Sequence, residues 1–126
     1  MTKEEATTII NNDLNNDELN PRNGGNVRFS NKTSSGKNVF WINICIDDRL
    51  LNNYHLILND NIKQEFTHLM IPANALDIQL FKVRKNSGKD HIDLELSYDE
   101  HNYLQDVKSG GTNFNFNPYV EKIYKI

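Results

Sequence analysis

The sequence predicts an α+β protein of one domain, with a mixed, largely antiparallel sheet, an N-terminal helix and short C-terminal helices. An apolar stripe at helical spacing comes first, short runs rich in β-branched and aromatic residues follow it, and Gly, Pro and Asn clusters separate these runs. The length of 126 residues fits a single core. We divide it into a helical segment at 1–20, a sheet core at 27–98, and a C-terminal helix and loop at 99–126.

Composition and charge argue against several classes of protein. A hydrophobic fraction of 37%, an aromatic fraction of 10% and a net charge of −3 do not fit a disordered chain. No apolar run approaches the roughly 20 residues that cross a bilayer, and the polar, acidic N-terminus does not resemble a secretory signal. The single cysteine, Cys45, lies in the most hydrophobic run, so we expect a buried free thiol and a cytoplasmic protein without a membrane partner.

The N-terminal segment has the start signal and the periodicity of a helix. Thr2 and Glu5 have the spacing of a capping box, in which each side chain bonds a free backbone amide of the other residue. An apolar stripe follows at Ala6, Ile9, Ile10 and Leu14. Pro21 and the following glycine pair predict that the helix has ended before residue 21.

Two strands are predicted next, with a polar turn at 32–37 between them. Residues 27–30 alternate between apolar and polar side chains, which is typical of a half-buried strand. Residues 39–46 are almost entirely apolar, which is typical of a central strand that is covered on both faces. We therefore expect Trp41 to be buried.

The middle of the chain predicts a hairpin. Residues 54–58 and 66–71 read as strands, and the short polar link between them favours antiparallel pairing. Pro72 ends the second strand because it has no amide to donate to a neighbouring strand. Residues 73–81 fit either a short helix or the start of a strand, and together with the N-terminal helix they are the expected cover of the sheet.

The C-terminal third predicts one more strand and short helices. Ile92, Leu94, Leu96 and Tyr98 alternate with polar residues, so 91–98 reads as a half-exposed strand near a sheet edge. Residues 99–108 read as a short helix that ends before Gly110, and 119–124 reads as a helical turn.

Two groups of charged residues are candidate binding sites. A basic group of Arg22, Arg28, Lys32 and Lys37 lies around the first predicted strand and its turn, and a solvated strand face explains these four charges equally well. Of the four, Arg28, Lys32 and Lys37 are the candidates for contacts with phosphates. Asp93 and Glu95 share one strand face and could hold a divalent metal. The alternative is that they simply form the solvent-facing side of an edge strand. The acidic net charge differs from the basic balance typical of nucleic-acid binders.

Histidines and aromatic residues give weaker signals. His55 and His68 lie on strands expected to be neighbours, but zinc needs a further ligand and no metal-ligand spacing occurs, so no metal site and no cofactor are predicted. Phe114, Phe116 and Tyr119 are spaced along a loop and would suit a protein interface if they are exposed.

The block from 26 to 76 resembles restriction-endonuclease-like nucleases of the PD-(D/E)xK type. The resemblance rests on Asn26-Val-Arg-Phe-Ser-Asn-Lys-Thr33, the aromatic strand at 39–44, and strands that lead to Ile71-Pro72. In the family, an acid-x-Lys motif ends the first of these strands. If Lys32 is the motif lysine, then Ser30 stands where the resemblance requires the second carboxylate, which implies an inactive copy or an acid supplied by a partner.

Three functional hypotheses remain open from the sequence. The first is a small non-catalytic nuclease-like domain that binds DNA, RNA or a nuclease or defence partner through Arg28, Lys32 and Lys37. The second is a protein–protein interaction module, as a subunit of a larger assembly or a homo-oligomer, without nucleic acid. The third is a metal-dependent hydrolase that uses Asp93 and Glu95.

Overall fold

The N-terminal helix is present in the computed structural model, which describes residues 1–33 and 36–126. Helix α1 spans Lys3–Leu14, and the predicted capping box is confirmed, with Thr2 and Glu5 exchanging hydrogen bonds of 3.1 Å. Asn15 ends the helix in the left-handed conformation that Asn tolerates. The middle of the predicted 32–37 turn lies outside the described residues.

In the described residues, seven strands form two sheets, which together with α1 confirms the α+β fold class. The strands are β1 (Val27–Asn31), β2 (Val39–Cys45), β3 (Tyr54–Asp60), β4 (Glu65–Ile71), β5 (Lys82–Arg84), β6 (His91–Ser97) and β7 (Val120–Lys125). Sheet A has the order β1-β3-β4-β7, with β1 parallel to β3 and the other pairs antiparallel. Sheet B has the antiparallel order β2-β6-β5. The predicted antiparallel pairing of 54–58 with 66–71 is confirmed.

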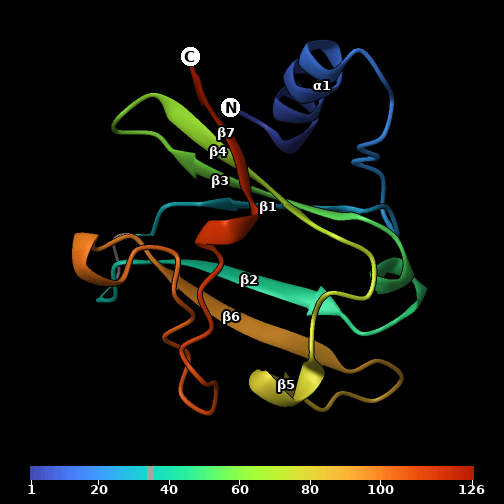
Figure 1. Cartoon of the computed structure of the whole chain (residues 1–126), viewed down its shortest axis with the longest axis vertical. Coiled ribbons are helices and arrows are strands. Elements are labelled where there is room, and N and C mark those ends of the chain that lie inside the picture. The colour runs from blue at the N-terminus through green and yellow to red at the C-terminus, as the bar shows by residue number, and fades with distance from the viewer. Residues whose placement is uncertain (34–35) are drawn as a thin grey trace.

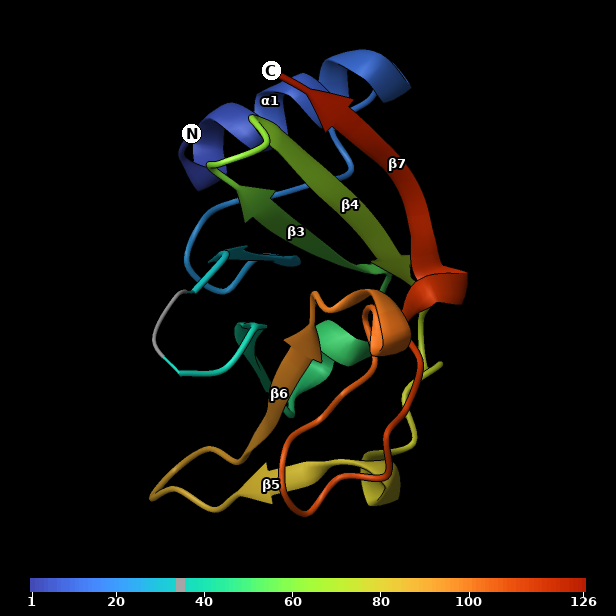
Figure 2. The same cartoon turned by 90° about the vertical axis from the view of Figure 1, so that its left-hand side faces the viewer.

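The two sheets and the helix form three layers, with α1 on one face of sheet A and sheet B on the other (Figures 1 and 2). The larger core lies between the sheets and includes Ile42, Leu56 and Leu94. The smaller core lies between α1 and sheet A and includes Ile10, Ile57 and Phe66. Strand β3 is therefore buried along its whole length, since it has a packed layer on each side.

Side chains of β1 join the two sheets where β1 approaches β2. Arg28 donates from Nε to the backbone oxygen of Asn43 at 2.7 Å, and its Nη2 donates to the Asn43 side-chain oxygen. The Ser30 hydroxyl donates to the backbone oxygen of Trp41 at 2.9 Å. Side chains thus satisfy carbonyl groups on the edge of β2 that would otherwise lack a strand partner.

The expectation that 39–46 is a central strand with Trp41 buried is wrong. Strand β2 is at the edge of sheet B, and Trp41 is 57% exposed. The reason is that α1 covers sheet A, while residues 73–81 do not form a covering layer. Instead they contain a short 3-10 turn at Ile78–Leu80 and lead into β5, which extends sheet B.

Two expectations about the C-terminal third are also wrong. Strand β6 is central in sheet B rather than at its edge, because β5 pairs along its other side. The segment 119–124 is not a helical turn: Tyr119 ends a 3-10 turn at Asn117–Tyr119, and the residues after it belong to strand β7. The predicted helix at 99–108 is limited to a 3-10 turn at Glu100–Asn102. Among the described residues, no helix has the length and apolarity needed to span a membrane.

Neighbouring residues of α1 test the packing of the smaller core. Ile10 is fully buried, whereas Ile9 is 39% exposed. We expect Ile10→Ala to lower the free energy of unfolding by about 2–5 kcal/mol, because it leaves a cavity against sheet A. Ile9→Ala, the matched control, should change it by less than about 0.5 kcal/mol. Urea titration measures both, and equal losses would contradict the helix orientation.

Candidate nucleic-acid interface

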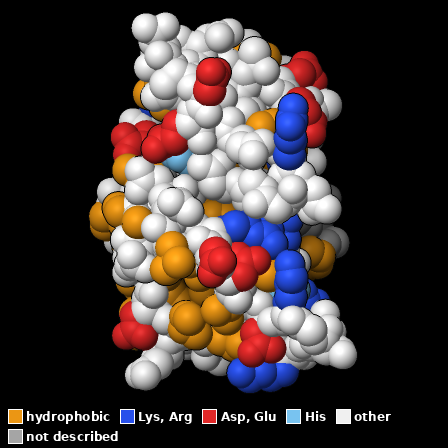
Figure 3. All heavy atoms as spheres, turned by 90° about the vertical axis from the view of Figure 1, so that its right-hand side faces the viewer, with side chains coloured by type: hydrophobic (Ala, Val, Ile, Leu, Met, Phe, Trp, Pro, Cys, Tyr) orange, Lys and Arg blue, Asp and Glu red, His pale blue; other side chains and the backbone are white. Residues whose placement is uncertain are grey.

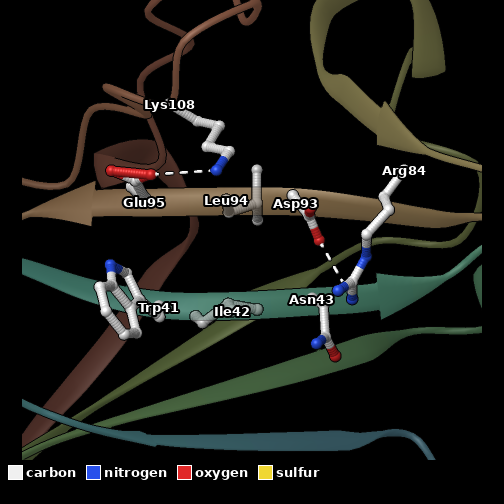
Figure 4. A pocket seen from close by; sticks show the side chains of 8 residues that line it. All are labelled: Trp41, Ile42, Asn43, Arg84, Asp93, Leu94, Glu95 and Lys108. Atoms are coloured by element: carbon white, nitrogen blue, oxygen red, sulfur yellow. Dashed lines mark ion pairs between the residues drawn. The ribbon is translucent and has the colours of Figure 1, made fainter.

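A groove of about 330 Å³ crosses the outer face of sheet B. Its lining comes from strands β2, β5 and β6 and from the loop that follows β6 (Figure 4). The lining residues are Trp41, Ile42, Asn43, Arg84, Asp93, Leu94, Glu95 and Lys108. The groove therefore combines one large aromatic side chain with charges of both signs on an otherwise regular antiparallel sheet.

Strand alternation places Trp41 and Asn43 side by side on this face. Ile42 points into the core, so the residues before and after it point outward. Trp41 is opposite Glu95 in the ladder, and Asn43 is opposite Asp93. Because directly opposite side chains lie about 5 Å apart, these four residues form one compact floor.

Two lysines hold the Glu95 carboxylate at one end of the groove. Lys37 Nζ is 2.7 Å from Oε1, and Lys108 Nζ is 3.3 Å from Oε2. Burial alone would raise the pKa of Glu95, but the two lysines outweigh it and hold the pKa below its usual value. Two cations thus share the Glu95 carboxylate, and Lys108 also interacts electrostatically with Asp106.

The other end of the groove has looser contacts. Arg84 Nη2 is 3.6 Å from Asp93 Oδ1, which is too long for a hydrogen bond. Arg28 donates hydrogen bonds only to the neutral Asn43 here, and no carboxylate of the described residues forms an ion pair with it. Four cations (Lys37, Lys108, Arg84 and Arg28) thus lie around the groove with Glu95, Asp93 and the buried Asp106.

Buried Asp106 fixes the loop that carries Lys108. Its Oδ1 accepts backbone amides from Glu95 and Lys108, each at 3.1 Å, and its side chain is fully buried. Burial raises the pKa of Asp106 above its usual value. Gly111 allows this arrangement, because a Cβ there would lie 2.8 Å from Asp106 Oδ2. The loop is therefore a preorganised wall of the groove.

The three basic residues singled out from the sequence do not all reach the groove. Arg28 and Lys37 contact groove residues, as described above. Lys32 instead pairs with Asp60 at 3.2 Å and lies 4.2 Å from the centre of the Tyr98 ring. Sequence reasoning missed Trp41, Asn43, Arg84 and Lys108 as members of this face. The alternation of β2 was the available signal for the first two.

The three aromatic residues proposed as an interface belong largely to the core. Phe116 is fully buried, so the expectation that it is exposed is wrong. Phe114 and Tyr119 are half-buried and pack on its ring, with centroid distances of 5.0 and 6.0 Å. The loop folds back so that these rings pack against the core between the sheets. There Phe81 makes further aromatic contacts with Phe114 and Phe116.

His55 and His68 do come together, as their strands predicted. Their Nδ1 and Nε2 atoms are 2.9 Å apart, and Glu18 Oε2 is 3.3 Å from His55 Nε2. Because a carboxylate repels a lone pair, the His55 proton belongs on Nε2, and His68 Nε2–H donates to His55 Nδ1. The described residues contain no group of three or more His, Cys, Asp and Glu side chains that could hold a metal.

A second feature of the surface is an apolar patch on the side of the molecule that carries the 3-10 turn Asp48–Leu51. Hydrophobic side chains gather over the middle and lower part of this side (Figure 3). A hollow there is lined mostly by apolar residues, namely Ile46, Leu50, Leu51, Tyr54, Ile71, Pro72, Ala75, Leu76 and Ile78. Leu51 is 59% exposed and Ile78 is 39% exposed.

Comparisons of this chain with protein-family models, with curated proteins and with solved structures found no match. The resemblance to restriction-endonuclease-like nucleases therefore stays a prediction. At the position of the missing acid, the Ser30 hydroxyl bonds the backbone oxygen of Trp41. Cys45 is buried and free, as predicted.

The histidine pair predicts a loss of stability in acid. Burial lowers the pKa of His55, and burial together with the His55 ring lowers the pKa of His68 to about 4. In the unfolded chain the histidines take up protons near their usual pKa of 6.5, whereas in the folded protein His68 takes up its proton only near pH 4. The free energy of unfolding therefore decreases as the pH falls from about 6.5 to about 4. We expect His68 to account for on the order of 3 kcal/mol of this loss.

Replacing the histidine tests this effect. His68→Asn should flatten the decrease in unfolding free energy between pH 7 and pH 4.5, measured by urea titration at each pH. The exposed His101 is the matched control, and His101→Asn should keep the wild-type slope. An unchanged slope in His68→Asn would contradict the assignment, whatever its stability at neutral pH.

Proposed function

We propose that this protein binds single-stranded nucleic acid on the outer face of sheet B. The observation that carries the proposal is the exposure of Trp41, the only tryptophan of the chain, in a groove bordered by cations. A large aromatic ring at 57% exposure leaves apolar area in contact with water unless a ligand covers it. Nucleic-acid bases are suitable ligands because each presents a flat face that stacks on an indole.

The charges around Trp41 fit a phosphate backbone. Lys37, Lys108 and Arg28 keep a net positive charge locally, for the reasons given above. Phosphate contacts supply most of the affinity that does not depend on base sequence. Elsewhere many cations are neutralised, as in the pairs of Lys32 with Asp60 and Lys122 with Asp13, so the net charge of −3 is compatible with one local binding face.

Single strands suit this face better than duplexes. In a duplex the base faces are stacked on one another and cannot reach an indole ring, whereas an unpaired base can be splayed onto it. The proposal concerns binding alone and agrees with the non-catalytic form of the nuclease-like hypothesis.

Tryptophan fluorescence tests the proposal directly, because Trp41 is the only source of indole emission. Titration with oligothymidylate or oligouridylate at low salt should quench this emission. Binding by the Trp41→Ala variant is measured with a labelled oligonucleotide. The affinity should be about 5- to 150-fold weaker, since a stacked base contributes about 1–3 kcal/mol. Leu51→Ala is the control, because it removes an exposed apolar side chain from a different surface.

Salt dependence provides an independent check on the cations. Lys37→Ala and Lys108→Ala should each reduce the slope of log affinity against log salt by about 0.7. Lys125→Ala, on the edge strand of sheet A, should leave the slope unchanged. An absence of binding to both oligonucleotides at low salt, or full affinity in Trp41→Ala, would overturn the proposal.

A protein partner is the second candidate function, and the apolar patch around Leu51 favours it. An exposed cluster of apolar side chains next to a shallow hollow is typical of protein contacts. If the chain forms a homo-oligomer through this patch, Leu51→Glu should convert the oligomer to a monomer in light scattering. A wild-type chain that is monomeric at high concentration would count against this function.

A further inference from the structure

We infer that the groove selects guanine among the bases of a single strand, with Trp41 stacking on the base while Asp93 and Asn43 read its edge. This inference rests on the proposed function and names the ligand of that site. It arises from a difference between the two carboxylates of the groove floor.

Glu95 and Asp93 occupy successive outward positions of β6 but differ in how their oxygens are used. Each Glu95 oxygen has its own lysine, and Glu95 is only 7% exposed. Asp93 has only the 3.6 Å contact from Arg84 to Oδ1, and no described residue donates a hydrogen bond to its Oδ2. Glu95 is therefore committed to the protein, whereas Asp93 presents a free acceptor to the groove.

Asn43 presents a donor beside this acceptor. Arg28 Nη2 donates to the Asn43 side-chain oxygen, which fixes the orientation of the amide and leaves Nδ2 without a hydrogen bond among the described residues. Asn43 is the direct ladder partner of Asp93. The Cβ atoms of Asn43 and Asp93 are therefore about 5 Å apart on the same face of the sheet, and the Arg84 guanidinium lies beside Asp93.

Trp41 lies close enough for one base to use all three residues. It is two positions from Asn43 on the same strand, a separation of about 7 Å, and it is the diagonal neighbour of Asp93. In Figure 4 the Trp41 ring lies over β2, the Asp93 carboxylate is directed from β6 toward β2 with the Arg84 guanidinium beside it, and the Asn43 amide extends away from β6. A purine that stacks on the indole has a suitable size to extend to Asp93 and Asn43.

Guanine is the base whose edge matches this pair of groups. Its N1–H and N2–H₂ donate side by side, as a carboxylate requires, and its O6 accepts, as the Asn43 amide requires. Adenine presents one amino donor beside the acceptor N1, cytosine presents one amino donor beside the acceptors N3 and O2, and uracil and thymine present a single N3–H between two carbonyl oxygens, so none of them has two adjacent donors. Each of these bases would place at least one acceptor against the Asp93 carboxylate or leave the Asn43 amide donor without a partner. A site built to accept hydrogen bonds from a base discriminates against bases that lack the matching donors.

The test uses oligothymidylates that carry one central guanine, adenine or cytosine, so that no guanine quadruplex forms. Quenching of Trp41 fluorescence in the wild-type protein should give an affinity about tenfold higher for the guanine strand than for the others. Asp93→Asn should bind all four strands, including plain oligothymidylate, with nearly equal affinity. Asp90→Asn, which makes the same change of charge outside the groove, should keep the preference.

The outcomes separate this inference from the proposed function. Equal wild-type affinity for all four strands, or a guanine preference that survives in Asp93→Asn, overturns the inference and leaves single-strand binding intact. If none of the strands binds at low salt, the proposed function fails and the guanine preference fails with it.

Discussion

The described part of this chain has one α-helix for two sheets, and the rest of the structure follows from that constraint. Sheet A has α1 on one face and sheet B on the other, so its central strand β3 is buried throughout. No segment of the described residues forms a third layer on the outer face of sheet B. That face must therefore remain in contact with water, and it carries the charged and amide side chains of the groove together with the exposed Trp41.

Buried polar groups hold the two sheets and the loops in register. Arg28 and Ser30 bond backbone oxygens of β2 across the junction between the sheets. Asp106 accepts two backbone amides and fixes the loop after β6. Such groups are costly to bury unless they are bonded, so each one specifies a single arrangement of the segments it joins. These bonds fix the segments that surround the groove, although it lies at the surface.

The sequence was most informative where periodicity and local chemistry acted together. The capping box at Thr2, the alternation of β6 and the short link between β3 and β4 predicted those elements correctly. The central strand was misplaced because β2 is the more hydrophobic segment, whereas β3 contains His55, Asn59 and Asp60, which are buried through hydrogen bonds and ion pairs. Composition alone does not show which polar residues will find partners.

The candidate site was predictable only in part. Arg28, Lys37, Asp93 and Glu95 were singled out as two separate groups, and the pairing of β2 with β6 brings them to one surface. That pairing spans about fifty residues of chain. Lys108 depends on the loop conformation set by Asp106, for which no local pattern exists. A single sequence therefore contained most of the site's residues but not the long-range contacts that assemble them.

The position of Arg28 has a consequence for how this protein can be divided. Arg28 belongs to sheet A, yet it orients Asn43 on sheet B. A fragment made of β2, β5 and β6 would keep Trp41, Asp93 and Glu95 but would lose the guanidinium that sets the amide. The surface is thus a property of both halves of the molecule, and the three-stranded sheet is not an autonomous module that could be transplanted with its surface chemistry intact.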